Sequence, residues 1–235
     1  MLSFQAVPLA STPTVTAEQM REVDRRMIEE LGIDLARMME NAGNRLAALA
    51  IDLFAPATVA VLAGPGGNGG GGLTAARHLS NRGVAVSVIL SHGEDRLATV
   101  SAEQLAILRR MGVAVANEPP SADLVVDALI GYSLHGPPRG RVAELIGWAN
   151  GSGASVLSLD VPSGLEATTG IAGKPCIRAA ATMTLGLPKT GLEGAPEIVG
   201  RLFLTDISIP PLVYERIGLK VPRLFDRDTI VELTS

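Results

Sequence analysis

From Thr58 onwards, short apolar segments alternate with segments whose apolar residues recur at helical spacing. Such alternation is typical of a mainly parallel sheet with helices on both faces. The expected strands are 58–62, 84–90, 123–127, 155–159, 180–185 and 201–205, and the expected helices between them are 73–81, 101–111, capped by Ser101, and 142–150. The sequence therefore predicts an α/β fold, which binds ligands at the carboxyl ends of its strands.

The N-terminal part of the chain predicts two helices. Thr16 and Gln19 have the spacing of a capping box, which starts a helix. The apolar face of this helix would consist of Met20, Val23, Met27 and Leu31. A second helix is expected over 34–54. Residues 1–13 are expected to form a flexible arm, and residues 14–235 a single domain onto which both helices pack.

Composition excludes several classes of partner. Aromatic residues make up 3% of the chain and the formal net charge is −4, so a nucleic-acid partner is not expected. No segment has the pattern of a secretion signal or a membrane span. Cys176 is the only cysteine, which excludes an intramolecular disulfide and a cysteine-based zinc site. We expect a soluble, cytoplasmic protein in which Cys176 packs near a turn rather than acting as a nucleophile.

A glycine-rich turn joins the first predicted strand to the next helix. Seven of the nine residues from Gly64 to Gly72 are glycine, with Pro65 and Asn68 as the exceptions. Glycines permit positive φ and let backbone N–H groups approach an anion, and the helix that follows adds its positive N-terminal end. The turn is followed neither by the Lys of a P-loop nor by the acidic residue of a dinucleotide-binding dehydrogenase. We expect it to bind the phosphates of a nucleotide-like molecule.

Two aspartates lie where apolar strands end. Asp127 and Asp160 would share the sheet edge with the glycine-rich turn, where one carboxyl group can bind a cation and another can act as acid and base. Capping a helix is the structural alternative for each. Ser163 either offers oxygen to an ion or caps its loop, and Lys189 either neutralises an anionic ligand or is solvated.

A second loop rich in Gly and Pro runs from Gly131 to Gly140, after the strand that ends at Asp127. It could close over a bound ligand. His135 lies in this loop, and we interpret it as an exposed loop histidine rather than a catalytic base.

These motifs together resemble the YjeF N-terminal domain family, the NAD(P)H-hydrate epimerases, over about Thr16 to Pro210. The resemblance rests on Met39-Glu-Asn-Ala-Gly43, the glycine-rich turn, Val126-Asp-Ala-Leu-Ile-Gly131, Leu159-Asp-Val-Pro-Ser-Gly164, Thr184 with Pro188-Lys189, and Asp206-Ile-Ser-Ile-Pro210. It implies a Rossmann-like three-layer αβα sandwich with a mostly parallel sheet and two extra N-terminal helices. It also implies a homodimer.

The resemblance implies an isomerase that interconverts the R and S forms of hydrated NADH or NADPH in metabolite repair. Asp160 would be the acid/base near the hydrated carbon and would also bind substrate. The other implied substrate-binding residues are Gly67, Asn68, Gly69, Gly70, Gly71, Gly131, Tyr132, Ser133, Leu134, His135, Gly136 and Pro137. The implied cofactor is a potassium ion, held by Asn68, Asp127 and Ser163.

The chain departs from the family pattern at two positions of the glycine-rich turn. The family's turn usually reads Gly-x-Gly-Asn-Asn-Gly-Gly-Asp-Gly, whereas this chain has Gly67 for the first Asn and Gly71 for the Asp. The alternative is therefore a catalytically impaired nucleotide-binding or dimeric interaction module of the same fold. A dehydrogenase is a third alternative. Because family members are often fused to a dehydratase, a separate dehydratase is an expected partner.

Overall fold

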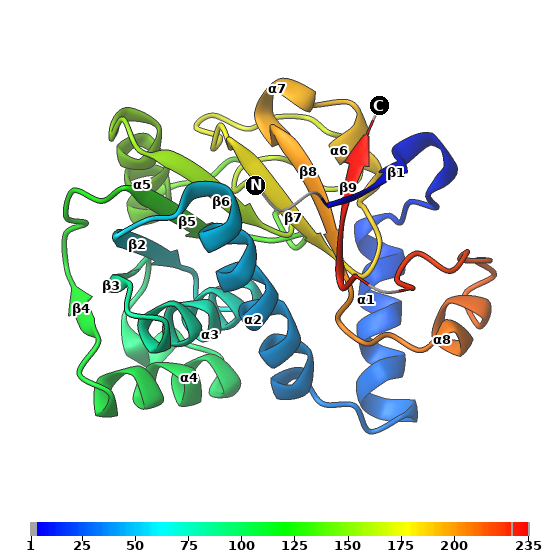
Figure 1. Ribbon diagram of the computed structural model, residues 1–235, viewed down its shortest axis with the longest axis horizontal. Helices are drawn as coiled ribbons and strands as arrows, with labels where there is room; N and C mark the ends of the chain where they lie inside the picture. Colours follow the sequence, from blue (N-terminus) through cyan, green and yellow to red (C-terminus); the bar gives the residue numbers. More distant parts are fainter. Residues whose placement is uncertain (1–3, 227, 235) are drawn as a thin grey trace.

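The computed structural model describes residues 4–226 and 228–234, which form one nine-stranded sheet covered by helices (Figure 1). The strands are β1 (Gln5–Pro8), β2 (Thr58–Ala63), β3 (Ala85–Leu90), β4 (Ala114–Ala116), β5 (Leu124–Ala128), β6 (Ser155–Leu159), β7 (Ala181–Leu185), β8 (Arg201–Thr205) and β9 (Ile230–Thr234). The α-helices are α1 (Ala17–Arg25), α2 (Leu35–Phe54), α3 (Gly67–Asn81), α4 (Thr99–Arg110), α5 (Gly140–Gly151), α6 (Thr190–Glu193), α7 (Pro196–Val199) and α8 (Pro211–Glu215). No helix within the described residues is long and apolar enough to cross a membrane.

The strand order is β1-β9-β8-β7-β6-β5-β2-β3-β4. All neighbouring pairs are parallel except β8 and β9. The chain runs outwards from β2 through β3 to β4 and then returns to the other side of β2 as β5. At such a reversal the loops after the two central strands diverge and leave a crevice at their carboxyl ends. The predicted α/β fold is confirmed, and its crevice lies between β2 and β5.

Alternate residues of the central strands pack against different helices. In β2, Val59 and Val61 belong to a core formed with α2, α3 and α4, whereas Ala60 and Leu62 belong to a core formed with α5. A third core covers the second face towards β8 and β9 and contains α1 and α8. These cores give the three-layer sandwich, and both of its strand faces are apolar because both are buried.

The glycine-rich segment is a helix rather than an extended turn. Helix α3 begins at Gly67, six residues before the predicted start at Leu73, and no glycine between 64 and 72 in the described chain adopts a positive φ. The expectation that these glycines supply positive φ is therefore wrong. They allow close packing instead: a Cβ on Gly64 would lie 1.9 Å from the carbonyl oxygen of Leu129, and one on Gly69 would lie 1.8 Å from that of Gly64.

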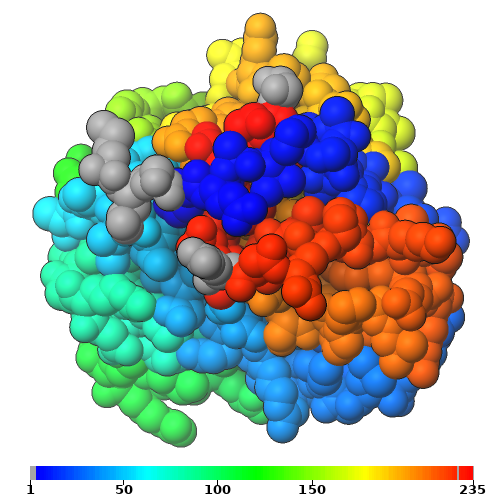
Figure 2. Space-filling view, turned by 45° about the vertical axis from the view of Figure 1, so that its right-hand side comes forward, coloured from blue at the N-terminus to red at the C-terminus, as the bar shows by residue number. Residues whose placement is uncertain are grey.

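The N-terminal arm is not loose over residues 5–8. These residues form β1, which pairs in parallel with β9, and Figure 2 shows the N-terminal segment lying against the C-terminal segment. The expected arm otherwise includes residues 1–3, which lie outside the described residues. The pairing was not predictable locally, because β1 and its partner are separated by more than 200 positions and β9 was not itself predicted.

Two further expectations about the helices are corrected. Ser101 does not cap α4, which begins at Thr99; the Ser101 hydroxyl instead donates to the carbonyl oxygen of Gly66 at 3.0 Å. The first predicted helix changes character at Arg26, where five residues form a π-helix. Short elements with few apolar residues, such as β4 and α6, were missed. The capping box of Thr16 and Gln19 is confirmed, with hydrogen bonds of 3.1 and 2.9 Å.

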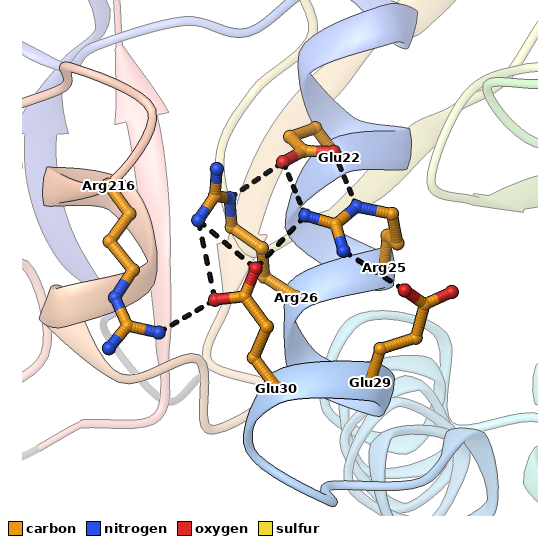
Figure 3. Close-up of polar contacts among 6 residues, drawn as sticks. All are labelled: Glu22, Arg25, Arg26, Glu29, Glu30 and Arg216. Atoms are coloured by element: carbon orange, nitrogen blue, oxygen red, sulfur yellow. Dashed lines mark hydrogen bonds and ion pairs between the residues drawn. The ribbon is translucent and has the colours of Figure 1, made fainter.

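An exposed ion-pair network ties α1 and its π-helical end to α8 (Figure 3). Arg25 and Arg26 both pair with Glu22, at 2.8 and 2.7 Å. Glu30 accepts from Arg216 on the segment just after α8, at 2.7 Å. The network therefore joins the N-terminal helix to the C-terminal part of the chain.

A pair of glycine variants tests the packing role of the α3 glycines. Gly69→Ala should lower the free energy of unfolding by about 3 kcal/mol, because its Cβ would meet backbone that cannot move aside. Gly67→Ala is the matched control: its nearest neighbour would be Met39 Cε at 3.8 Å, and the gain in helix propensity should stabilise by up to about 1 kcal/mol. Urea unfolding measures both, and equal effects would contradict the packing role.

The ion-pair network should make stability fall in acid. Hydrogen bonds from Arg25 lower the pKa of Glu22 to about 2 from an ordinary value of 4.5. A carboxyl group whose pKa is lower in the folded state stabilises fully above the unfolded pKa and loses its effect as pH falls towards the folded one. We therefore expect Glu22→Gln to destabilise at pH 6 and to have a shrinking effect as pH falls towards 3. Unfolding curves over this range measure it, and a pH-independent difference would contradict it.

Candidate active site

The loops after β2, β5 and β6 meet at the crevice and enclose a cavity of about 250 Å³. Its lining comes from both faces of the sheet: α1 on one side, α2 and α3 on the other. The residues that line it are Met20, Asp24, Leu35, Met38, Met39, Ala42, Gly67, Asn68, Gly71, Gly131, Tyr132, Ser133, Leu159, Asp160, Leu185, Lys189 and Ile207. A mostly apolar lining with a few convergent polar groups is the usual character of a small-molecule site.

Asp160 and Lys189 form a buried ion pair in this cavity. The Asp160 side chain follows β6, and Lys189 lies just before α6; their residues are 3% and 1% exposed. Lys189 Nζ donates to Asp160 Oδ1 and to the carbonyl oxygen of Leu185, the latter at 2.9 Å. Of the two expectations for Lys189, the solvated one is wrong. The ammonium group offsets the carboxylate charge where water cannot.

The backbone at Asp160 adopts the left-handed conformation, with φ of 70°. A non-glycine residue in this conformation is strained, and such strain is concentrated at functional sites. The hydrogen bond from the Asp160 amide to the Met183 carbonyl, at 2.8 Å, holds the strained peptide to β7. The local conformation thus turns the carboxyl group from the end of β6 into the cavity.

Asp127 lies deeper in the fold and has no exposed surface. Its hydrogen-bond donors within the described residues are all neutral groups. Ser163 donates both its amide, at 2.8 Å, and its hydroxyl, at 2.6 Å, and Ser158 donates its hydroxyl at 2.9 Å. Burial raises the pKa of Asp127 above its ordinary value, against the effect of these donors. The structure thus brings two of the three predicted potassium ligands, Asp127 and Ser163, into direct contact.

Asn68, the third predicted ligand, lies in the first turn of α3 beside Gly131. A Cβ on Gly131 would lie 3.1 Å from Asn68 Oδ1 and 3.3 Å from Asp160 Oδ2, so both side chains reach the same glycine. Asn68 Nδ2 is buried and lacks a hydrogen-bond partner among the described residues. A buried amide without a partner is costly, which indicates that a ligand supplies one.

A second cavity of about 390 Å³ adjoins the first and shares Gly67, Asn68, Gly131 and Ser133 with it. It lies at the N-terminus of α3, where the first backbone N–H groups of a helix are free to bind an anion. Of the predicted substrate-binding residues, Leu134, His135 and Pro137 line this cavity. In the described structure Gly69, Gly70 and Gly136 line neither cavity; the first two are buried against neighbouring elements.

Two site residues were missed by the sequence analysis or left outside the site, namely Asp24 and Lys189. Asp24 lies on α1 and accepts a hydrogen bond from the Tyr132 hydroxyl. The sequence signal for Asp24 was an acidic residue within an otherwise apolar stripe, four positions after Met20.

Burial raises the pKa of Cys176 to about 11, which keeps its thiol protonated at neutral pH and agrees with a packing role.

Double-mutant cycles should reveal the coupling of Asp160 and Lys189. Lys189→Met leaves a buried carboxylate without its cation and should lower the free energy of unfolding by about 3–5 kcal/mol. Adding Asp160→Asn removes that charge, so the double variant should lose clearly less than the sum of the single losses. Urea unfolding of the four proteins measures the difference, and additive losses would show that the pair is not coupled.

The sequence matches the family described as YjeF-related protein N-terminus over residues 35–191. An NAD(P)H-hydrate epimerase of Dehalogenimonas lykanthroporepellens is 48% identical over 219 residues, which cover 90% of this chain and 88% of the relative. An NAD(P)H-hydrate epimerase of Rhodopirellula baltica is 34% identical, with coverage of 89% and 90%. The bifunctional NAD(P)H-hydrate repair enzyme Nnr of Thermofilum pendens is 38% identical over 86% of this chain, but this match spans only 41% of the relative.

The fold is also similar to a solved structure. The crystal structure of the yeast protein ynu0 superposes with a TM-score of 0.83 at 25% identity, covering 94% of this chain and 100% of the yeast chain. The family match covers α2, α3 and the loops that carry Asp160 and Lys189, whereas α1 lies before its first residue. The chain therefore belongs to the YjeF-related protein N-terminus family.

Proposed function

We propose that the chain is an NAD(P)H-hydrate epimerase, an isomerase that interconverts the R and S forms of hydrated NADH or NADPH. The names of the relatives from Dehalogenimonas and Rhodopirellula support this activity, and their matches cover about nine tenths of this chain. The observation that carries the proposal is the buried Asp160–Lys189 pair in an apolar cavity that opens onto the N-terminus of α3. The cavity around Asp160 suits a ring, and the adjoining cavity at the N-terminus of α3 suits phosphates.

The hydrated nicotinamide ring would occupy the first cavity, between the methionines of α2 and the Asp160 carboxyl group. The diphosphate would then lie along the second cavity, at the free N–H groups of α3. The helix end favours a nearby anionic group by about 0.3–1 kcal/mol. Arg139 and His92 also line this second cavity and add positive or hydrogen-bonding groups at its far side.

Epimerisation at the hydrated carbon requires the hydroxyl group to leave and water to return on the other face. The lone pair of the ring nitrogen forms a C=N bond as the C–O bond breaks, and a proton from the site converts the departing hydroxide into water. Water then adds to the opposite face, the π electrons return to nitrogen, and a proton returns to the site. Asp160 would be the acid/base for this exchange, with Lys189 holding its carboxyl group and supplying the proton that it delivers.

The residues implied for potassium suit such an ion. Asp127 carries a carboxylate that is buried without a cationic partner among the described residues, and the Ser163 hydroxyl lies 2.6 Å from it and 3.2 Å from the Ile130 carbonyl oxygen. Oxygen atoms that carry one formal negative charge suit a hard cation. With Asn68 at the adjoining edge, these residues would hold the ion, which would supply positive charge near the bound phosphates.

The alternative, a catalytically impaired module of the same fold, depends on Gly67 and Gly71, the two glycines that depart from the family pattern. Gly71 lines the first cavity, and a Cβ there would lie 2.8 Å from Leu159 Cδ2, so glycine leaves room in the floor of the cavity. A Cβ at Gly67 would make only ordinary contacts, the nearest with Met39 Cε at 3.8 Å. Neither position contributes to the Asp160–Lys189 pair, and the named activities of the relatives favour the enzyme.

The resemblance also carries proposals about cellular context. We infer a cytoplasmic homodimer that works beside a separate dehydratase. The relatives named bifunctional repair enzymes support the last point, because the match with this chain covers 41–43% of those from Thermofilum pendens and Salinibacter ruber. The rest of those chains has room for a second activity.

An assay with separated epimers tests the proposed function. Wild-type protein in potassium chloride should speed interconversion, and Asp160→Asn should lower the rate by about 10²-fold or more because proton transfer at the hydrated carbon is lost. Replacing potassium by a large organic cation should lower the rate as well. Chromatographic separation of the epimers measures each rate. A wild-type rate equal to that without protein would contradict the epimerase and favour the nucleotide-binding module.

A further inference from the structure

Asp24 faces the same cavity as Asp160 but reaches it from a different layer of the fold. It lies on α1, among the apolar residues Met20, Val23 and Met27, and it lines the cavity that Asp160 also lines. It accepts a hydrogen bond from the hydroxyl of Tyr132. Within the described part of the chain it forms no ion pair. Asp24 is partly buried, and a carboxyl group on the apolar side of an amphipathic helix has no packing advantage there.

The two carboxyl groups have opposite environments. Asp160 is paired with an ammonium group, whereas Asp24 is held by a neutral phenol. Burial raises the pKa of Asp24 above its ordinary value; the Tyr132 hydrogen bond and the Lys189 charge act in the other direction, and the charge of Asp160 adds to the rise. Sites that use two carboxyl groups for acid and base chemistry separate them in this way.

The position of Asp24 relative to the ion pair is fixed at both ends of its helix. Val15, just before the capping residue Thr16, bonds on both sides of Lys189: its amide donates to Pro188 at 2.9 Å, and its carbonyl accepts from Thr190 at 3.0 Å. Asp24 lies eight residues after Thr16, roughly 12 Å along the helix. Lys189 Nζ is also 5.9 Å from the centre of the Tyr132 ring, so the ring that holds Asp24 borders the ion pair.

We propose that Asp24 is a second catalytic acid/base, serving the face of the hydrated ring opposite to Asp160, with Tyr132 as the residue that positions it. This inference rests on the proposed epimerase activity. Inversion needs proton transfer on both faces of the ring, and one carboxyl group cannot reach both. Asp24 and Asp160 line one cavity from two different elements, which is the arrangement that the reaction requires.

The proposed reaction conserves atoms, protons and electrons. In one direction the C–O bond breaks on the Asp160 face, the nitrogen lone pair forms the C=N bond, and the proton delivered by Asp160 makes the leaving group water. A water on the Asp24 face then forms the new C–O bond, its proton passes to Asp24, and the π electrons return to nitrogen. The ion pair ends with one proton fewer and Asp24 with one more; solvent exchange or the reverse reaction restores both. No oxidant or reductant takes part.

Oxygen-18 exchange in Asp24→Asn separates this role from a structural one. Each epimer is incubated in H₂¹⁸O, and inversion and label uptake are measured together by chromatography and mass spectrometry. For the epimer whose hydroxyl faces Asp160, we expect inversion to fall about 10²-fold while label uptake with retention persists, because that face still has its acid/base. For the other epimer, both inversion and uptake should fall. Loss to the same extent for both epimers, or no loss, would overturn the proposal.

Three comparisons complete the experiment. Asp160→Asn should show the mirror-image pattern, with label uptake preserved for the epimer whose hydroxyl faces Asp24. Glu29→Gln is the charge-matched control just after the same helix, because Glu29 is exposed, pairs with Arg25 (Figure 3) and does not line the cavity; it should behave as wild type. Tyr132→Phe should lower the kcat of inversion by a larger factor than it changes KM. Absence of inversion in the wild-type protein would refute the epimerase itself, which is a different outcome from wild-type activity with an unaffected Asp24→Asn.

Discussion

At the centre of the molecule, the backbone of Gly64 lies against that of Leu129. The Gly64 amide donates to the Ala128 carbonyl at 3.0 Å, and a Cβ at Gly64 would lie 1.9 Å from the Leu129 carbonyl oxygen. This contact joins the loops after β2 and β5 where the strand order reverses. It brings the start of α3 beside Gly131, and therefore places the free N–H groups of a helix next to the carboxyl group of Asp160. Glycine is needed because two backbones share the space of one side chain.

Electrostatics then decides what this crevice can do. Asp127 and Asp160 both follow central strands, yet their surroundings differ: neutral donors from Ser158 and Ser163 surround the first, and the ammonium group of Lys189 meets the second. A buried charge needs a partner. Asp160 has that partner in Lys189, whereas Asp127 would have it in the cation that we propose. The same residue type at the same sheet edge thus has different surroundings, because different elements follow the two strands.

Much of this could be predicted from the sequence, because it depends on local patterns. The periodicities gave the central strands, and Thr16 with Gln19 gave the start of α1. Other features depend on contacts between distant segments. Ser101 looked like a cap, but its hydroxyl bonds to Gly66, 35 positions away; β1 forms only because β9 offers an edge. The glycines of α3 were interpreted as a turn, since helix propensity disfavours glycine, and it is the packing of Gly69 against Gly64 and of Gly70 against Met39 that explains them.

The missed residues share a cause that is relevant to mechanism. Asp24 and Lys189 are far apart in sequence, and neither belongs to a glycine-rich motif, but the backbone of Val15 joins their segments on both sides of Lys189. The start of α1 follows Val15, which bonds to the segment that carries Lys189, and the π-helical segment after α1 ends at Glu30, which pairs with Arg216. The proposed epimerisation inverts one carbon and would use one proton-transfer group on each face of the ring. In that proposal, the N-terminal helix holds the second of these groups in the cavity.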